Sequence, residues 1–178
     1  MLGGRSVGAG SVAVLVILVL VLLLGDRESG GGGGPSDSGG GAPAGKAVTA
    51  DVSRVVDGDT IEVDLGGDEE DVRYIGIDTP ETVKPDTPVQ CFGPEASERN
   101  HELVEGRRVR LIFDRERRDV YGRLLAYVYV GDEFVNGELI EGGYARTLEI
   151  EPNTSRAEQL ARLQQEASDA GRGLWGAC

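Results

Sequence analysis

A strand that ends at a Thr-Pro pair is the feature that most constrains how this chain can fold. The stretch from Val72 to Ile77 is rich in valine, tyrosine and isoleucine, which favour strands, and Pro80 ends it because proline cannot donate to a ladder. Asp78 and Glu81 therefore lie at the strand end and in the loop beyond. A carboxylate there is held by the sheet but open to solvent, so it can bind a hard cation without burial of an unpaired charge.

An acidic turn precedes this strand. Asp57-Gly58-Asp59-Thr60 lies between two apolar runs, where an Asp-Gly pair predicts a β-hairpin, although such turns also occur for backbone reasons alone. Asp59 and Asp78, with the main-chain carbonyl of Thr79, would form an oxygen-only site. Such a site favours Ca²⁺, with Mg²⁺ or Mn²⁺ as competitors. The single histidine and the two distant cysteines offer no ligand set for zinc.

Two arginines add the groups that phosphoryl chemistry needs. Arg73 lies in the strand and Arg123 in a later loop, and guanidinium forks suit phosphate oxygens. The alternatives are a cross-strand salt bridge for Arg73 and membership of a basic run for Arg123. Strict alternation places Arg73 and Asp78 on opposite faces, so we expect Gly76 to form a bulge or bend that re-aims the strand end.

Short strands dominate the chain from Ala47 onward. Alternating apolar residues predict strands over 48–56, 60–65, 71–77, 107–113 and 124–130. Capping and stop residues predict helices over 95–105 and 134–141, and a longer one from Thr154 or Ser155 to about Ala170. Five strands with a helix after the third predict an α+β fold, a closed five-stranded β-barrel of OB type with three packed helices.

The N-terminal part of the chain differs from this domain. Residues 1–25 contain an apolar run long enough to form a membrane-spanning helix, and residues 26–46 form a Gly/Ser/Pro-rich linker that we expect to be flexible and disordered. Residues 47–178 form the folded domain. We favour a signal anchor over a cleaved signal peptide because no small-residue cleavage site follows closely. The domain would then lie outside the cytoplasm, anchored to the membrane, or secreted if the segment is cleaved.

The charge of the domain counts against simple binding of a polyanion. It carries 28 acidic and 15 basic residues, and an acidic protein repels nucleic acid unless its charge is uneven or a cation intervenes. The charge is uneven, since six arginines lie between Arg107 and Arg118 against only Asp114 and Glu116. The metal site predicted above would supply a cation.

Five motifs occur in order between about Val48 and Trp175: D-G-D-T, R-x4-D-T-P-E-T, F-G-P-E-A-S, D-x-Y-G-R-x-L-A-Y and V-N. This ordered set resembles the staphylococcal nuclease-like (thermonuclease) family. The resemblance implies the same barrel, with Asp59, Asp78 and the carbonyl of Thr79 as the protein's ligands for Ca²⁺. It also implies cleavage of DNA and RNA that leaves a 3′-phosphate and a 5′-hydroxyl.

The remaining family roles fall on four residues. The resemblance implies that Glu81 directs the attacking water, that Arg73 and Arg123 bind the phosphate and oppose its growing charge, and that Tyr121 donates to a substrate phosphate. A glutamate beyond a strand end is otherwise a solvated loop residue, and a tyrosine there is as readily a barrel-rim residue.

Departures from the family pattern lie near Tyr121. Val120 stands where the family often has lysine, and Leu148 and Ile150 stand where it has tyrosines, so base stacking on aromatic rings is expected to be weaker.

His101 has no histidine partner for catalysis and is expected at the surface or in helix packing. Cys91 and Cys178 would pair as a disulfide if the domain is extracytoplasmic.

The sequence thus predicts a membrane-tethered, calcium-dependent nuclease that acts on DNA, RNA or both by metal-assisted in-line attack of water. No protein partner is implied, and we expect a monomer. The alternatives are a catalytically silent OB-fold module that serves as a binding or scaffold piece on the membrane, and a purely structural protein. Retention of both aspartates, the glutamate and both arginines favours the enzyme.

Overall fold

The computed structural model describes residues 47–82 and 88–178. The predicted signal anchor (1–25) and linker (26–46) lie outside the described residues. Within the described residues, no helix is long and apolar enough to cross a membrane.

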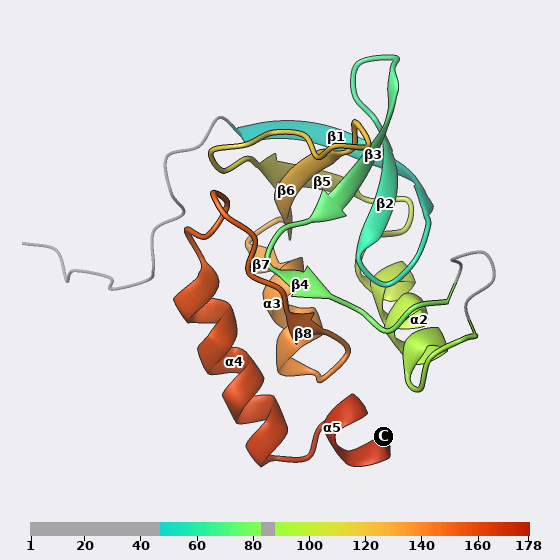
Figure 1. Ribbon diagram of the computed structural model, residues 1–178. Coiled ribbons are helices and arrows are strands. Elements are labelled where there is room, and N and C mark those ends of the chain that lie inside the picture. The colour runs from blue at the N-terminus through green and yellow to red at the C-terminus, as the bar shows by residue number, and fades with distance from the viewer. Residues whose placement is uncertain (1–46, 83–87) are drawn as a thin grey trace, which may run out of the picture. The chain divides into compact units, whose positions relative to one another are not determined.

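A closed β-barrel forms the body of the described domain (Figure 1). Each strand pairs antiparallel with its neighbour in the order β3-β2-β1-β5-β6, and a parallel pairing of β3 with β6 closes the barrel. This pairing sets Arg73 opposite Leu125 and Tyr74 opposite Ala126. The barrel strands are β1 (Ala47–Val55), β2 (Thr60–Asp64), β3 (Glu69–Tyr74), β5 (Arg108–Ile112) and β6 (Leu124–Val130).

The barrel interior is aliphatic, because alternate strand residues face inward. Ile61 and Val63 of β2, Val72 of β3 and Leu111 of β5 are fully buried. The alternation that predicted a strand over 60–65 is present in β2, where Ile61 and Val63 are buried and Asp64 is exposed. The predicted OB-type α+β architecture is confirmed for the barrel and its packed helices.

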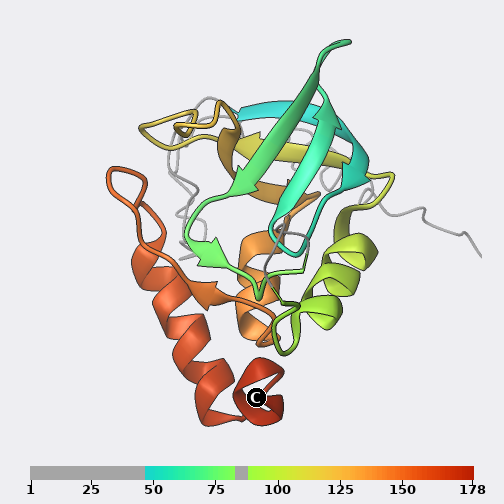
Figure 2. The ribbon, with the colours of Figure 1, turned by 45° about the vertical axis from the view of Figure 1, so that its right-hand side comes forward.

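Helices cover one end of the barrel (Figure 2). Helix α2 (Gly93–Val104) begins with Pro94 in its first turn, where the missing N–H costs nothing. It is followed by α3 (Val135–Glu141), α4 (Ala157–Asp169) and a short C-terminal helix, α5 (Leu174–Ala177), which the sequence did not predict. The predicted cap of α4 is wrong: Arg156 occupies the N-cap position, and neither Thr154 nor Ser155 caps the helix through its side chain.

The predicted third strand is interrupted, and the break shapes the site. β3 ends at Tyr74, and a short strand β4 (Ile77–Asp78) follows after a turn and pairs with β8 (Arg146–Thr147). Gly76 in the turn has a φ of 80°, which L side chains rarely adopt, and a Cβ atom there would also displace the Leu160 side chain of α4, so glycine is favoured. The predicted bend at Gly76 is therefore present. A further short strand, β7 (Glu133–Phe134), extends the barrel sheet beside β6.

Candidate active site

Arg73 lies between two aspartates that come from separate segments. Its Nε is 3.1 Å from Oδ1 of Asp59, which precedes β2, and its Nη2 is 2.9 Å from Oδ1 of Asp78, which ends β4. Its Nη1 donates to the main-chain oxygens of Tyr74 and Ile77, at 2.9 and 2.8 Å, on either side of the bend. The turn at Gly76 thus brings together two side chains that simple alternation places on opposite faces.

Asp59 is held rigidly from several directions. Its side chain is buried, and Oδ2 accepts hydrogen bonds from the Thr79 main-chain N–H at 2.8 Å and the Thr79 hydroxyl at 3.1 Å. The Asp59 main-chain oxygen accepts from the Tyr74 N–H at 3.0 Å. Gly58 packs so closely on Thr79 that a Cβ atom would lie 2.7 Å from its Oγ1. The D-G-D-T turn is therefore docked directly onto the strand end that carries Asp78.

Negative charge is concentrated at this turn. Burial and the neighbouring charge of Asp59 raise the pKa of Asp57 to about 6, although the Asp59 N–H donates to its Oδ1 at 3.0 Å. Burial also raises the pKa of Asp78, while the charge of Arg73 opposes that effect. Burial is the larger cause in both cases, and the neighbouring carboxylates add to it.

Arg123 is oriented by a tight turn between β5 and β6. Asp119 Oδ1 accepts the main-chain N–H groups of Tyr121 and Arg123, and Asp119 Oδ2 accepts Nε of Arg123 at 2.7 Å. Arg118 ties the turn to β3, since its guanidinium binds both carboxylate oxygens of Glu70 and the Gly122 carbonyl. The two Nη groups of Arg123 donate no hydrogen bond within 47–82 and 88–178, so they are available to an anion.

Glu81 follows β4 and is fixed by its neighbours in the loop. The Thr82 N–H donates to Oε1 of Glu81 at 2.9 Å. The Glu81 main-chain N–H donates to the side-chain Oε1 of Gln90. In return, the Gln90 main-chain N–H donates to the Glu81 carbonyl.

All predicted catalytic and metal-binding residues line one polar cavity of about 110 Å³. Both predicted guanidinium groups therefore share a single space with the carboxylates of the acidic turn, of the β4 end and of the loop beyond it. The lining consists of Asp57, Asp59, Thr60, Arg73, Asp78, Thr79, Pro80, Glu81 and Arg123.

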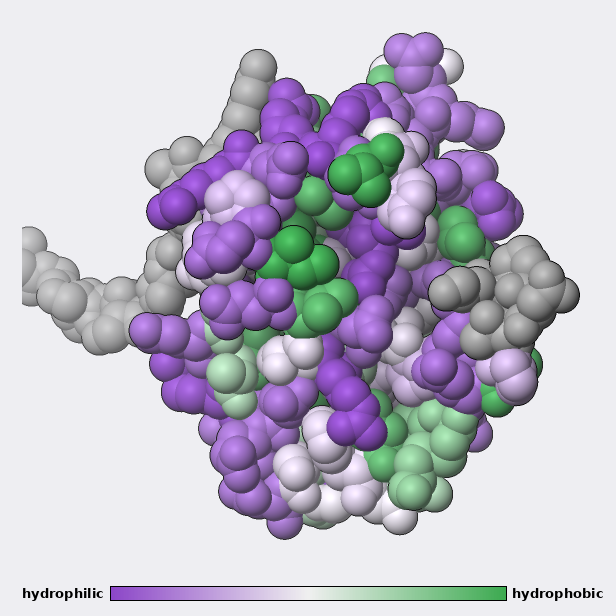
Figure 3. All heavy atoms as spheres, viewed as in Figure 1, coloured by the Kyte–Doolittle hydropathy of each residue, from purple (hydrophilic) through white to green (hydrophobic). Residues whose placement is uncertain are grey.

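A larger cavity of about 360 Å³ adjoins it and shares Arg73 and Arg123. Tyr121 lies in its lining, 82% exposed, with its ring 5.6 Å from the Arg123 guanidinium. Val120 and Ile150, at 93% and 61% exposed, also line it and present aliphatic surface where the sequence predicted weak stacking. On the face shown in Figure 3, a few hydrophobic residues lie among hydrophilic ones.

Comparison with known proteins assigns the chain to a family. The profile of the staphylococcal nuclease homologue family matches residues 71–177. The chain is 44% identical over 127 residues to the thermonuclease of Staphylococcus hyicus, covering 71% of this chain and 75% of that protein. It is 48% identical over 124 residues to the thermonuclease of Staphylococcus intermedius, covering 70% and 74%. The chain belongs to the staphylococcal nuclease family.

A further relative of this staphylococcal nuclease family member is endonuclease YncB of Bacillus subtilis (strain 168). It is 46% identical over 132 residues, which cover 73% of this chain and 63% of the relative.

The donor set of this nuclease family member fits a hard cation that takes most of its ligands from water. No three carboxylate, imidazole or thiol side chains converge as a metal cluster in the described parts of the chain. A cation would therefore rely on Asp59, Asp78, the Thr79 carbonyl and water, which is an oxygen-only set. The excess of carboxylates over guanidinium groups in the cavity lining favours a positive ion there.

Three residues support the site, and the sequence did not predict a role for any of them, even though Asn136 belongs to the V-N motif and Asp119 to the D-x-Y-G-R motif. Asn100 of α2 accepts from the Tyr74 hydroxyl at 3.0 Å and donates to the Asp57 carbonyl at 2.8 Å, so it supports the acidic turn. Asn136 of α3 donates to the Ile75 carbonyl at 2.9 Å and supports the bend. Asp119 orients Arg123 as described above. A buried asparagine in an amphipathic helix is the signal that could have identified the first two.

The remaining predicted residues lie away from the cavity. His101 is on the exposed side of α2, with Nδ1 3.2 Å from Oε2 of Glu105. The basic run is partly neutralised, because Arg108 pairs with Asp51 and Arg118 with Glu70. Two of the six arginines are thus paired with acidic side chains.

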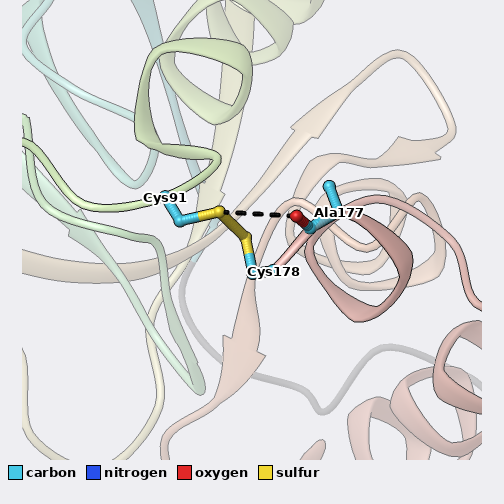
Figure 4. The surroundings of a disulfide bond; sticks show 3 residues. All are labelled: Cys91, Ala177 and Cys178. Carbon is cyan, nitrogen blue, oxygen red and sulfur yellow. Dashed lines mark hydrogen bonds between the residues drawn. A yellow bond between two sulfur atoms is a disulfide. The ribbon is translucent and has the colours of Figure 1, made fainter.

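Cys91 and Cys178 form a disulfide that joins the loop before α2 to the C-terminus (Figure 4). Their Cα atoms are 6.1 Å apart, and Cys91 Sγ lies 3.9 Å from the Ala177 carbonyl oxygen. The bridge closes a loop of 87 residues. In the chain-entropy treatment, closure of such a loop stabilises the fold by roughly 4 to 5 kcal/mol.

Proposed function

We propose that this nuclease is calcium-dependent and hydrolyses DNA, RNA or both to 3′-phosphate and 5′-hydroxyl ends. One observation carries the proposal: Asp59, Asp78, Thr79, Glu81 and both arginines line a single polar cavity. The chemistry that bound Ca²⁺ supplies at such a site is stabilisation of charge on a phosphate oxygen. Asp59, Asp78 and the Thr79 carbonyl would hold it.

Glu81 is the group in this cavity best placed to act on water. Its carboxylate extends from a loop that is pinned at both the main chain and Oε1. A carboxylate so fixed can accept a proton from an attacking water or orient that water in line with the scissile bond. Positioning of this kind accounts for a large part of the barrier lowering in phosphoryl transfer.

The two arginines, which both line the cavity, would bind the phosphate. Arg73 is 14% exposed at its side chain and is fixed by four contacts, so it needs no reorganisation when charge develops. Arg123 uses Nε for Asp119 and leaves its Nη groups for phosphate oxygens. Tyr121, beside Arg123, would donate its hydroxyl to a neighbouring phosphate of the same strand.

The overall charge supports dependence on a cation. The chain carries a net charge of −13, and its cavity lining holds four carboxylates against two guanidinium groups. A polyanion approaching this surface is repelled until positive charge is added. Calcium in the cavity would therefore aid binding of substrate as well as its hydrolysis.

We also propose an extracytoplasmic location, either anchored through residues 1–25 or secreted if they are cleaved. The apolar run Val12–Leu24 supports an anchor, and the Cys91–Cys178 disulfide is typical of an oxidising compartment. The domain is proposed to act as a monomer on nucleic acid, with no protein partner.

The test is digestion of single- and double-stranded DNA and RNA by the full chain, with calcium, with magnesium and with a chelator. We expect calcium-dependent cleavage, with 3′-phosphate ends detected by resistance of the products to 3′-extension until a phosphatase is added. A silent OB-fold module predicts no cleavage under any of these conditions.

Two substitutions assign the roles. Glu81→Gln and Arg123→Ala should each lower kcat by about 100-fold or more, with an unchanged fold by circular dichroism. Glu166→Gln and Arg162→Ala, on the exposed side of α4, are matched controls that change the same charges away from the cavity. Wild-type kcat in Glu81→Gln or Arg123→Ala would remove that residue from the mechanism.

A further inference from the structure

Glu81 and Gln90 bracket the loop that leads from the site to α2. The Glu81 N–H donates to Gln90 Oε1 at 3.0 Å, and the Gln90 N–H donates to the Glu81 carbonyl at 2.9 Å. Gln90 is itself exposed and belongs to no helix or strand. Gln90 is therefore one support of the Glu81 main chain, beside Gly93, where an added Cβ atom would lie 3.2 Å from the Glu81 carbonyl oxygen.

The residue after Gln90 is Cys91, which the disulfide ties to Cys178 (Figure 4). Cys91 is exposed and contributes nothing to the barrel core. Gln90 also accepts the Gly93 N–H at 3.0 Å through its main-chain oxygen. A covalent anchor thus lies one residue from the pair of hydrogen bonds that fixes Glu81.

The other end of the disulfide, Cys178, follows a helix that is packed on the rest of the domain. Leu174 of α5 is buried, and its N–H donates to the Gly143 carbonyl at 2.9 Å, which attaches α5 to the end of α3. The Trp175 ring stacks under the Arg146 guanidinium at 4.2 Å, and Arg146 pairs in register with Asp78. Cys178 is therefore attached to the same β4–β8 ladder that positions Asp78.

We propose that the Cys91–Cys178 disulfide is a redox-sensitive positioning device for Glu81, acting through Gln90. This rests on the proposed role of Glu81. In the oxidised chain, the C-terminal helix, the disulfide and Gln90 form a continuous connection from the β4–β8 ladder to the Glu81 main chain. Reduction breaks that connection at the S–S bond between Cys91 and Cys178.

The reductive step is a simple exchange. A dithiol gives two electrons and two protons, the S–S bond of the protein breaks, and Cys91 and Cys178 become thiols while the reagent closes to its own disulfide. We expect the fold to survive reduction, although the stabilisation from loop closure is lost, because other contacts hold the start of α2. Phe92 stacks on Tyr144 with ring centroids 5.5 Å apart, and a Cβ atom at Gly93 would lie 3.1 Å from the Pro80 carbonyl oxygen.

The experiment uses the full chain with calcium. For the wild type and each variant, kcat and KM are measured before and after reduction by a dithiol. We expect kcat to fall about tenfold in the wild type and in the Cys91→Ser/Cys178→Ser double variant, while KM changes by less than about twofold. Gln90→Ala, which keeps the disulfide, should show a similar loss of kcat. Circular dichroism at the assay temperature establishes the folded fraction for each.

The deciding measurement is made in the Glu81→Gln background. If the disulfide acts through Glu81, reduction leaves the residual kcat of Glu81→Gln unchanged, because the group being positioned is already gone. An equal tenfold fall in that background, or no fall in the wild type, would overturn the proposal. The proposed function fails separately, if Glu81→Gln itself retains full activity. Gln90→Ala keeps the proposal testable even if the serine variants do not fold.

Discussion

Asp119 holds Arg123 by two hydrogen bonds, from its main-chain N–H at 3.0 Å and from its Nε at 2.7 Å. The same carboxylate also accepts the Tyr121 N–H. One side chain therefore fixes both the backbone of the turn and the direction of the guanidinium. Arg123 therefore reaches the cavity from this turn, which Arg118 ties to Glu70 of β3.

Removal of this support should lower catalysis more than binding. Asp119→Ala is expected to reduce kcat by about 100-fold, the order of loss that misplacement of a catalytic group produces. Asp119→Asn should lose less, because its amide oxygen can still accept the main-chain N–H groups. Steady-state kinetics on single-stranded DNA check both. Asp132→Asn, in the exposed turn after β6, is the matched control and should behave as wild type.

The same pair predicts how stability depends on pH. Burial alone would raise the pKa of Asp119, but the Arg123 side chain and two main-chain N–H groups lower it on balance. A depressed pKa in the folded state means that this stabilisation is present above the unfolded value of about 3.9 and is lost as pH falls through the folded value. Urea unfolding should show Asp119→Asn less stable than wild type at pH 6, with the difference shrinking below about pH 4. A constant difference across this range would contradict the prediction.

Asp59 should matter for stability as well as for metal. Asp59→Ala leaves the buried Thr79 N–H without its acceptor, which costs about 1 to 3 kcal/mol of unfolding free energy. Calcium at 100 times its dissociation constant should stabilise the wild type by about 2.7 kcal/mol and the variant by far less. Urea unfolding with calcium and with chelator measures both effects. Asp132→Ala should keep the full calcium response.

The aliphatic wall of the larger cavity should limit how strongly bases bind. Ile150→Tyr places a ring at an exposed position of that wall, and base stacking on an aromatic ring is worth about 1 to 3 kcal/mol. KM for single-stranded DNA should fall by about fivefold or more, with kcat little changed. Ile150→Leu, which adds no ring, should leave KM as it is; an equal fall there would exclude stacking as the cause.

The core of the site was predictable because its residues sit in patterns with strong local meaning. Thr79-Pro80 marks a strand end, and the conflict between Arg73 and Asp78 pointed to a bend at Gly76, which the structure contains. The Arg73 contacts to both aspartates then follow from the fold.

Other parts depended on long-range packing that no local pattern reports. The two-residue strands β4 and β8 are too short to show a period, so their pairing was not predicted. Thr154 and Ser155 have the composition of a helix cap, but the Ser155 N–H is used by Asp114 and the helix starts later, after Arg156. The Gln90 pairing with Glu81 spans a loop without periodicity and was also missed.

Barrel closure has a consequence for when this protein can cut. Arg73 lies in β3 and Arg123 immediately precedes β6, and these two strands meet only at the parallel seam, about fifty residues apart along the chain. Contacts so distant in sequence form late, since the entropy of loop closure must be overcome first. A nascent or partly unfolded molecule therefore holds apart the two arginines proposed to bind phosphate. We expect hydrolytic activity only after β3 and β6 have paired.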